Sequence, residues 1–373
     1  MKSFVYDLPC PPNLSVWWNM GSLLGFCLVV QILTGFLLSC FYTAHEDMAF
    51  DSVAFVMREV NSGWLVRNIH VNMASAMFAC MYVHIGRGIY YGSYRLYKVW
   101  LSGFLLMFLM MLTAFTGYVL PWGQMSYWAA QVITNLVTVI PYVGKDVAEW
   151  VWGDYSLGNF TLKRFFSIHF TVPYLILVAV VGHLILLHEG GSGNPLGVDS
   201  DSSLVRFHTY YTLKDLCGVM MLSGVVGIFV FFYPNVFVDP TNLIPCNYMK
   251  TPMKIHPEWY FLFLYTVLRC VQSKSGGVLL MFSAVLILLA LPLFHIGDFE
   301  GMAHYTLCQV FFWVWVANWC FMNYMGLCES VSPWVEWGGY STMFYFGYFF
   351  SIPLCQRVDE YLIKTIKIKD SSV

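Results

Sequence analysis

The chain has 373 residues, of which 58% are hydrophobic and 18% aromatic, and only 11% are charged, against roughly 25% in an ordinary soluble domain. This composition excludes a disordered chain, a coiled coil and a nucleic-acid binder with a basic face. The net charge of −2 implies no strongly charged polymer as a partner. A soluble protein could not bury so much apolar surface, so we expect these side chains to face a lipid bilayer.

Eight stretches contain no Asp, Glu, Lys or Arg, and each is long enough, or nearly so, for the roughly 20 apolar residues of a membrane-spanning helix. The stretches are continuously apolar, whereas the strands of a membrane barrel alternate. We therefore predict an all-α integral membrane protein with eight transmembrane helices. The stretches are 8–45, 68–86, 99–144, 165–188, 216–238, 275–297, 301–328 and 337–356.

The longest stretch exceeds one span and is interrupted at Leu120–Gly123, which contains a proline. We expect one helix over about 100–119 and then an interfacial segment over 121–163. A second long connection, 239–274, lies on the same side of the membrane. Long connections in a compact protein are usually functional.

An even number of spans places both ends of the chain on one side of the membrane. Lys and Arg are nearly balanced, with ten on the side of the termini and nine on the opposite side. The short connection Arg87–Lys98 carries three cations and no acid, and short loops weigh most in the positive-inside rule. We therefore expect the termini on the electrically negative side. No cleavable leader pattern precedes the first span.

Four histidines form a repeated pattern in two of the predicted spans. His70 and His84 lie 14 residues apart in the second span, and His169 and His183 lie 14 apart in the fourth. Fourteen residues is close to four helical turns and roughly 21 Å of rise, so each pair lies on one helix face at two depths. Because the two spans run in the same direction, His70 can face His169, and His84 can face His183.

A buried pair of imidazoles suits a haem iron with both axial positions filled, which favours electron transfer over oxygen binding. Zinc fits less well because nothing nearby supplies further ligands. The 11 cysteines include no CxxC or CxxCH, which argues against a disulfide framework, a zinc ribbon and covalently attached haem. The alternatives are a proton relay and histidines that only hydrogen-bond one another between helices. Two pairs at equal spacing favour two stacked haems.

Glycines repeat the same spacing on the flanking spans. Gly21 and Gly35 lie 14 residues apart in the first span, as do Gly103 and Gly117 in the third. A porphyrin plane needs backbone that can be approached without a Cβ. Close helix packing explains either pair alone at least as well. The shared spacing on four helices favours a haem at each level.

Three arginines, Arg67, Arg87 and Arg164, lie within three to five residues of one of these histidines at the membrane ends. Such cations would pair with haem propionates. For each arginine, an equally good explanation is that a residue flanking a membrane span extends its charged end to the surface.

Two polar clusters lie on opposite sides of the predicted membrane. Glu258 opens an apolar stretch near one surface, where it is either a helix-start charge or a proton acceptor with a shifted pKa. On the side of the termini, His188-Glu189 and Lys214-Asp215 combine proton donors and acceptors. The alternative for this second cluster is that it forms the polar ends of two helices.

From about Asp7 to the last predicted helix, the chain resembles cytochrome b of the ubiquinol–cytochrome c oxidoreductase (complex III), mitochondrial type. The last two helices match mainly in hydropathy. The plastid counterpart is split and has one more residue between the histidines of the fourth span, whereas this chain is unsplit. The motifs that carry the resemblance are Arg67–His70, His84–Tyr94, Pro121–Ser126 and Pro257–Tyr260.

The resemblance implies two non-covalent b-type haems, stacked inside a four-helix bundle formed by the first four spans. His70 and His169 would ligate the iron of the low-potential haem, near the positive side. His84 and His183 would ligate the iron of the high-potential haem.

The resemblance also implies two quinone sites. Quinol would be oxidised on the positive side, where Glu258 would accept a proton and where Tyr118, Phe115 and Tyr260 would shape the pocket. The residues that match the quinone reduction site on the other side are His188, Ser192, Lys214 and Asp215.

The implied mechanism is the Q cycle. Ubiquinol would give one electron to a Rieske iron–sulfur protein and one to this chain, which would reduce quinone across the membrane while protons are translocated. Activity would need the Rieske protein, a membrane-anchored c-type cytochrome, other complex III subunits and membrane lipids. We expect a homodimeric complex in the mitochondrial inner membrane, with a bacterial plasma membrane less favoured, and no nucleic-acid partner.

We divide the chain into residues 1–212, the haem-binding bundle, and residues 213–373, four further helices with a quinol-site loop at 234–275. Two other functions stay open. A dihaem membrane anchor of another quinone-linked oxidoreductase would leave the two polar clusters unexplained. A secondary transporter is disfavoured because no convincing internal repeat is found.

Several positions depart from the pattern of the family. Gly193 stands where Asn is common near the quinone reduction site. Thr251 and His256 replace a usual Pro and Lys near Glu258. Ligand contacts at Gly193 are therefore in doubt.

The family usually has Gly-Ala after Trp128, where this chain has Ala129-Ala130. The added methyl of Ala129 should crowd the quinol oxidation pocket, where strobilurin-type inhibitors bind in relatives. We therefore predict reduced sensitivity to strobilurins with quinol turnover retained, measured as cytochrome c reduction by the complex. Full inhibition at ordinary doses would contradict this prediction.

Overall fold

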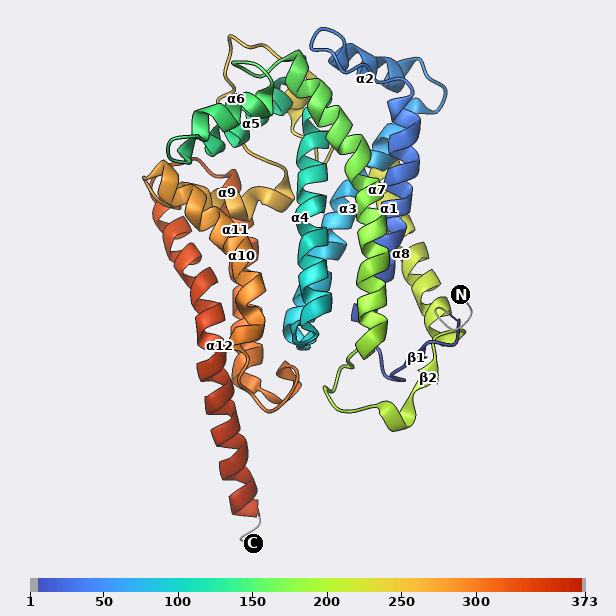
Figure 1. Ribbon diagram of the computed structural model, residues 1–373, viewed down its shortest axis with the longest axis vertical. Helices are drawn as coiled ribbons and strands as arrows, with labels where there is room; N and C mark the ends of the chain where they lie inside the picture. The colour runs from blue at the N-terminus through green and yellow to red at the C-terminus, as the bar shows by residue number, and fades with distance from the viewer. Residues whose placement is uncertain (1–5, 371–373) are drawn as a thin grey trace.

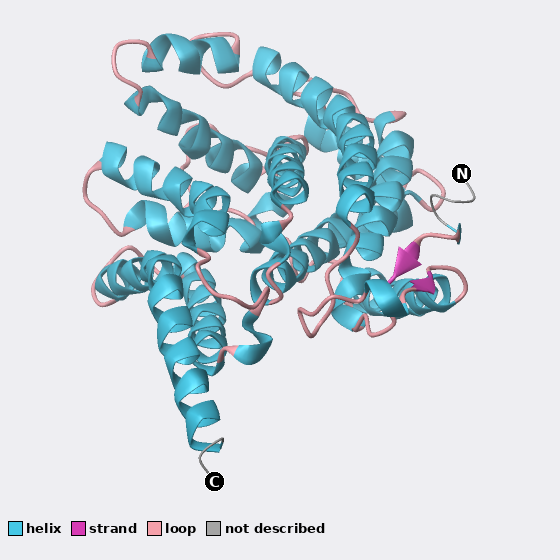
Figure 2. Ribbon diagram, turned by 60° about the horizontal axis from the view of Figure 1, so that its bottom comes forward, coloured by secondary structure: helices cyan, strands magenta, loops and turns pink. Residues whose placement is uncertain are grey.

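Helices form most of the chain in the computed structural model, which describes residues 6–370 and, for 366–370, the backbone alone. The helices are α1 (Met20–Ser39), α2 (Ala49–Arg58), α3 (Gly63–Tyr90), α4 (Tyr97–Val119), α5 (Gln124–Asn135), α6 (Gly144–Trp152), α7 (Asn159–Gly190), α8 (Tyr210–Phe232), α9 (Leu262–Arg269), α10 (Lys274–Phe294), α11 (Thr306–Leu327) and α12 (Trp334–Asp370). Two short strands, β1 (Pro9–Cys10) and β2 (Val205–Arg206), form an antiparallel pair near the N-terminus (Figure 2).

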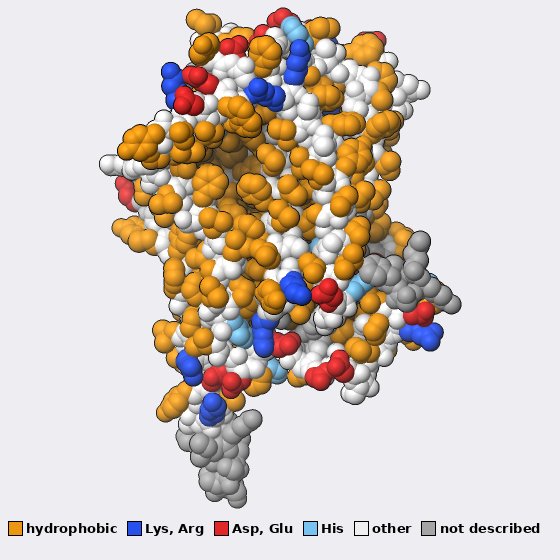
Figure 3. All heavy atoms as spheres, viewed as in Figure 1, with side chains coloured by type: hydrophobic (Ala, Val, Ile, Leu, Met, Phe, Trp, Pro, Cys, Tyr) orange, Lys and Arg blue, Asp and Glu red, His pale blue; other side chains and the backbone are white. Residues whose placement is uncertain are grey.

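The long helices run along one axis of the molecule, and α2, α5 and α6 lie across its upper end (Figure 1). Strand β1 and the C-terminal half of α12 lie toward the lower end of this view. Apolar side chains cover the middle of the face shown in Figure 3, and charged side chains gather near its two ends. This distribution is what a protein that crosses a bilayer requires.

Five helices of the described chain are long and apolar enough to cross a membrane, so the protein is a multi-pass membrane protein. They are Val16–Ser39, Tyr97–Val119, Asn159–Gly190, Tyr210–Phe232 and Lys274–Phe294. Helices α3, α11 and α12 fall on the three remaining predicted stretches. The total of eight spans stays a prediction.

The break at Pro121 is confirmed. Helix α4 ends at Val119, and Trp122 has a positive φ of 53°, so the chain turns sharply out of the helix axis. The following segment forms α5 and α6 across the upper end, joined by the 3₁₀ turn Leu136–Val139. The indole of Trp152 on α6 donates to Thr134 on α5 at 2.7 Å, which fixes the two short helices against each other.

The N-terminal helices pack in pairs, α1 with α3 and α4 with α7. Helix α8 packs against α1 and α3, so it lies with this bundle in space although the predicted division at 212/213 assigns it to the second part. Helices α9 to α12 pack on one another. The division of the chain into two parts stays a prediction.

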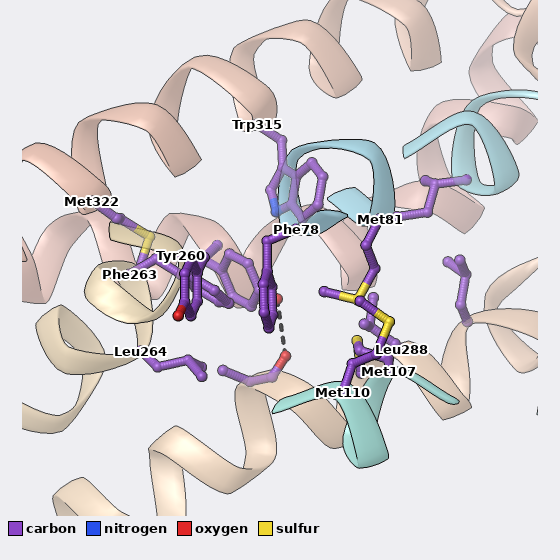
Figure 4. Close-up of a cluster of buried hydrophobic side chains, with 14 of the residues drawn as sticks. Phe78, Met81, Met107, Met110, Tyr260, Phe263, Leu264, Leu288, Trp315 and Met322 are labelled. Atoms are coloured by element: carbon purple, nitrogen blue, oxygen red, sulfur yellow. Dashed lines mark hydrogen bonds between the residues drawn. The ribbon is translucent and has the colours of Figure 1, made fainter. Parts of the chain in front are cut away.

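One apolar core joins the two groups of helices (Figure 4). Phe78 on α3 stacks on Tyr260 with ring centroids 3.9 Å apart and planes 6° from parallel. Met107 and Met110 of α4 and Trp315 of α11 belong to the same buried cluster. The segment that carries Tyr260 is therefore held by side chains from both groups.

Glycine is required at one contact between two lower loops. Gly92 has a φ of 74°, and a Cβ at this position would overlap the backbone carbonyl of Glu300. Gly92→Ala should therefore lower the stability of the solubilised protein by about 3 kcal/mol or more, the sum of left-handed strain and overpacking. The measurement is thermal unfolding in detergent.

The matched control is Gly197→Ala. Gly197 has a φ of 63°, and the nearest atom to an added Cβ, in the side chain of Glu300, lies at an ordinary contact distance of 3.4 Å, so this substitution adds only backbone strain. Equal destabilisation by both substitutions would contradict the proposed overlap at Gly92.

Candidate functional site

The structure brings the four histidines together in the predicted pairs. The ring centroids of His70 on α3 and His169 on α7 lie 6.1 Å apart, with planes 82° apart. Those of His84 and His183, on the same two helices, lie 6.5 Å apart, with planes 60° apart. Two facing imidazole pairs are therefore stacked along the bundle.

Hydrogen bonds at Nδ1 orient three of the four rings. Nδ1 of His70 lies 2.8 Å from the hydroxyl of Thr34, and that of His183 lies 2.7 Å from the hydroxyl of Ser102. Nδ1 of His169 lies 2.8 Å from the carbonyl of Thr113. A partner at Nδ1 leaves Nε2 for a metal, which is the usual arrangement of ligating histidines.

The four predicted glycines lie against the four imidazole rings. A Cβ on Gly117 would overlap His169, and a Cβ on Gly35 would come within 3.1 Å of Cε1 of His70. The corresponding distances are 3.3 Å from Gly103 to His183 and 3.6 Å from Gly21 to His84. The glycines thus make room for the histidine rings themselves. From the sequence, we expected them to make room for a porphyrin plane.

The residues present fit haem. An iron held by two imidazole nitrogens at about 2.0 Å each, with ring centres about 1.1 Å beyond the nitrogens, would separate the centroids by about 6.2 Å. The observed 6.1 and 6.5 Å bracket this value. No group of three or more His, Cys, Asp or Glu side chains in the described chain is placed to hold a metal ion. The donor set therefore matches bis-histidine ligation rather than zinc.

The predicted arginines have different surroundings. Arg67 lines the same cavity as His70 and His169. The guanidinium of Arg87 lies over the ring of Trp18, 5.2 Å from its centroid, and its buried Nε lacks a hydrogen-bond partner among the described residues. Arg164 instead donates to the carbonyls of Trp150 and Val151 at the C-terminal end of α6, where a cation is favoured. The structure does not bring Arg164 to the histidine pairs.

One cavity extends from His70 and His169, the upper histidine pair, to Glu258 and Tyr260 of the motif Pro257–Tyr260. His169, Gly117 and Tyr118 line one part of it, and Glu258 and Tyr260 line another. A ligand in this cavity could contact the carboxylate while lying beside the paired imidazoles.

Glu258 is a partly buried carboxylate that hydrogen-bonds the hydroxyl of Tyr118. Burial raises the pKa of Glu258 to about 8, the negative charge of Asp239 adds to the rise, and the hydrogen bond from Tyr118 opposes it. Glu258 is therefore largely protonated at neutral pH and can exchange a proton near pH 8.

Two predicted pocket residues do not line this cavity. Phe115 packs edge-on against Phe165, with ring centroids 5.7 Å apart. Ala129 is buried on α5, with 3% of its surface exposed, but is not among the lining residues. The predicted crowding by its methyl therefore gains no support from this cavity and stays a prediction.

The lower polar cluster is built around the segment that precedes α1. The ammonium of Lys214 donates to the carbonyls of Leu14 and Ser15, both at 2.6 Å. The indole of Trp18 donates to the hydroxyl of Ser192 at 3.0 Å. The chain thus brings Lys214 and Ser192 to one short segment, while His188 lies in the last turn of α7.

Sequence reasoning missed two residues of this cluster, Trp18 and Asn19. The amide of Asn19, which is almost completely buried, donates to the backbone carbonyl of Lys214 at 2.9 Å. The sequence offered little signal for them, because tryptophan is common at the ends of membrane-spanning helices. Asp215, next to Lys214, hydrogen-bonds Ser22 of α1.

The fold and these sites define a helical multi-pass membrane protein with two facing histidine pairs between two polar clusters. Residues 5–191 match the family model described as cytochrome b/b6/petB, and residues 245–346 match that described as cytochrome b (C-terminal)/b6/petD. A chain of a structure described as a hyperthermophilic respiratory Complex III is 32% identical, with a TM-score of 0.90, over 96% of this chain and 95% of that one.

The chain therefore belongs to the cytochrome b family. It is the electron-transfer core subunit of a quinol–cytochrome c oxidoreductase and acts as a part of that enzyme.

The glycine contacts generate a graded prediction for haem binding. Gly117→Ala should displace His169 and abolish most haem binding at the upper pair, whereas Gly21→Ala, at an ordinary contact distance, should be tolerated. Gly35→Ala should fall between them. The measurement is b-haem per chain, from the visible spectrum of the purified protein.

Gly25→Ala is the control, since nothing lies within 4 Å of a Cβ added at this position of α1. Equal haem loss in Gly25→Ala and Gly117→Ala would show that the imidazole contacts do not decide haem binding.

Proposed function

We propose that this chain oxidises a quinol in the upper cavity and reduces a quinone at the lower cluster, as the Q cycle requires, with two b-type haems in between. The observation that carries the proposal is the arrangement along one axis: a protonatable carboxylate in a cavity, two imidazole pairs, and a second polar cluster. A membrane anchor with one quinone site needs only one of the two clusters.

The finer parts of the proposal concern topology and assembly. Eight spans would place the lower end, with both termini and the loop Arg87–Lys98, on the negative side of the membrane. The complex would also contain a Rieske iron–sulfur protein, a membrane-anchored c-type cytochrome and a second copy of this chain. The mitochondrial inner membrane is the proposed location.

The residues of the chain have distinct tasks in this mechanism. His70 and His169 would hold the upper haem, and His84 and His183 the lower one. Bound haem supplies a centre that takes up and releases single electrons. Thr34, Thr113 and Ser102 keep the imidazoles in the orientation that ligation needs.

Glu258 takes the proton that quinol must lose when it is oxidised. Its raised pKa, of about 8, matches a base that accepts a proton at the site and later gives it to water. Tyr118 orients the carboxylate, and the Phe78 ring fixes Tyr260 beside it. The backbone carbonyl of Tyr260 also accepts a hydrogen bond from Tyr82.

Haem content and turnover together test the proposal. The purified complex should contain two b-haems per chain that reduce at separate potentials, and it should reduce cytochrome c with a quinol. One haem or none would refute the four-histidine site. Two haems without quinol oxidation would favour a membrane anchor of another enzyme.

Glu258→Gln should lower the kcat of quinol oxidation by roughly a hundredfold, in the range for loss of a general base. Only the carboxylate form can accept a proton, so the activity of the native chain should rise as the pH increases through about 8 and then level off. In the variant this rise should disappear. The measurement is the pH profile of cytochrome c reduction.

Glu329→Gln is the control, because Glu329 forms an exposed ion pair with Lys254 at 3.2 Å. It should leave the profile unchanged. A Glu258→Gln variant with the native pH profile would remove Glu258 from the reaction.

A further inference from the structure

A histidine and a carboxylate pair with each other close to Glu258. Nε2 of His256 is 3.1 Å from Oδ2 of Asp239. The second oxygen of Asp239 accepts from the backbone N–H and the hydroxyl of Thr241, at 2.7 and 2.5 Å. These bonds hold Asp239 as a fixed acceptor directed at His256.

Both nitrogens of the His256 ring face an oxygen acceptor. Nε2 faces the carboxylate of Asp239, and Nδ1 lies 3.3 Å from the carbonyl of Pro257. A neutral imidazole has one N–H, so it can satisfy only one of the two acceptors. Both acceptors receive a hydrogen bond only when the pair holds an additional proton. The pair is then either an imidazolium with a carboxylate or an imidazole with a carboxylic acid.

The pair is placed to connect Glu258 with water. His256 is two residues from Glu258, and Asp239 is close enough for its charge to raise the pKa of the Glu258 carboxyl. The His256 side chain is 25% exposed, against 12% for Asp239, so the imidazole is the member that meets solvent.

We propose that Asp239 and His256 form the proton exit relay of the quinol oxidation site, an inference that rests on the proposed function. Glu258, after taking a proton from quinol, passes it to the carboxylate of Asp239. The Nε2–H of the His256 imidazolium is released to water when the partly exposed ring turns away from Asp239, and Nε2 then takes the proton held by Asp239 when the ring turns back. One proton enters the pair and one leaves, so the pair returns to its starting state.

The relay makes His256 a positioning and transfer residue that does not touch the quinol. His256→Gln keeps a donor for Asp239 but cannot carry a proton, so kcat should fall about tenfold with an unchanged KM for quinol. The haem spectrum should stay native. His45→Gln is the matched control, because His45 pairs with Asp47 at 3.7 Å in the connection between α1 and α2, with exposed side chains.

Chemical rescue separates a relay from a structural ion pair. In the complex that carries His256→Ala, added imidazole should restore most of the lost kcat, because a free base can take the place of the missing ring. The same imidazole should not stimulate Glu258→Gln or the native complex. Asp239→Asn should lower kcat as His256→Gln does, and imidazole should not rescue it.

The outcomes distinguish the inference from the proposed function. A native complex without quinol oxidation would remove the proposed function itself. A native complex that depends on Glu258, together with a His256→Gln variant of native kcat, would overturn only the relay. Loss of kcat in His256→Ala without imidazole rescue would assign the pair a structural role, provided that the haem spectrum is unchanged.

Discussion

The structure depends on holding four imidazoles inside an apolar bundle, where water cannot satisfy or orient them. A free ring would rotate and leave a polar nitrogen without a partner, which is costly in a membrane. Three of the rings solve this with a hydroxyl or carbonyl at Nδ1. All four rings lie against a glycine of the neighbouring helix, so the helices must keep one register along their whole length.

This fixed register explains why much of the site could be predicted from the sequence. The interval of 14 residues recurs in His70 and His84, His169 and His183, and the glycines of α1 and α4. A straight helix converts such an interval into two depths on one face. The pairing of the histidines was therefore predictable from their spacing on two helices that run in the same direction, and the break after α4 from a proline within one segment. The family motifs added the expected tasks of the residues, which geometry alone left open between haem, relay and packing.

Contacts between distant segments were not predictable in this way. Lys214 binds the carbonyls of Leu14 and Ser15, which lie about two hundred residues earlier in the chain. Arg164 stands five residues before His169, yet its guanidinium binds the end of α6. In both cases the sequence shows a cation near a membrane end, and tertiary packing decides which acceptor it meets. The position of Ala129 away from the cavity lining has the same origin, since it depends on how α5 is rotated against its neighbours.

The two polar clusters hold their charges by different means, and this difference bears on function. At the lower cluster, backbone carbonyls fix Lys214, so the position of a cation is set by the chain itself. In the upper cavity, Glu258 meets side chains from other segments, with Tyr118 on α4 and Asp239 ahead of the motif. The motif also rests on Phe78 and Tyr82 of α3 through Tyr260. The carboxylate is thus carried by the C-terminal part of the chain, whereas the imidazoles beside it belong to the N-terminal bundle. Any change that loosens the packing of Tyr260 on α3 would alter the environment of Glu258 without touching the histidines, so proton uptake and electron transfer can be perturbed separately.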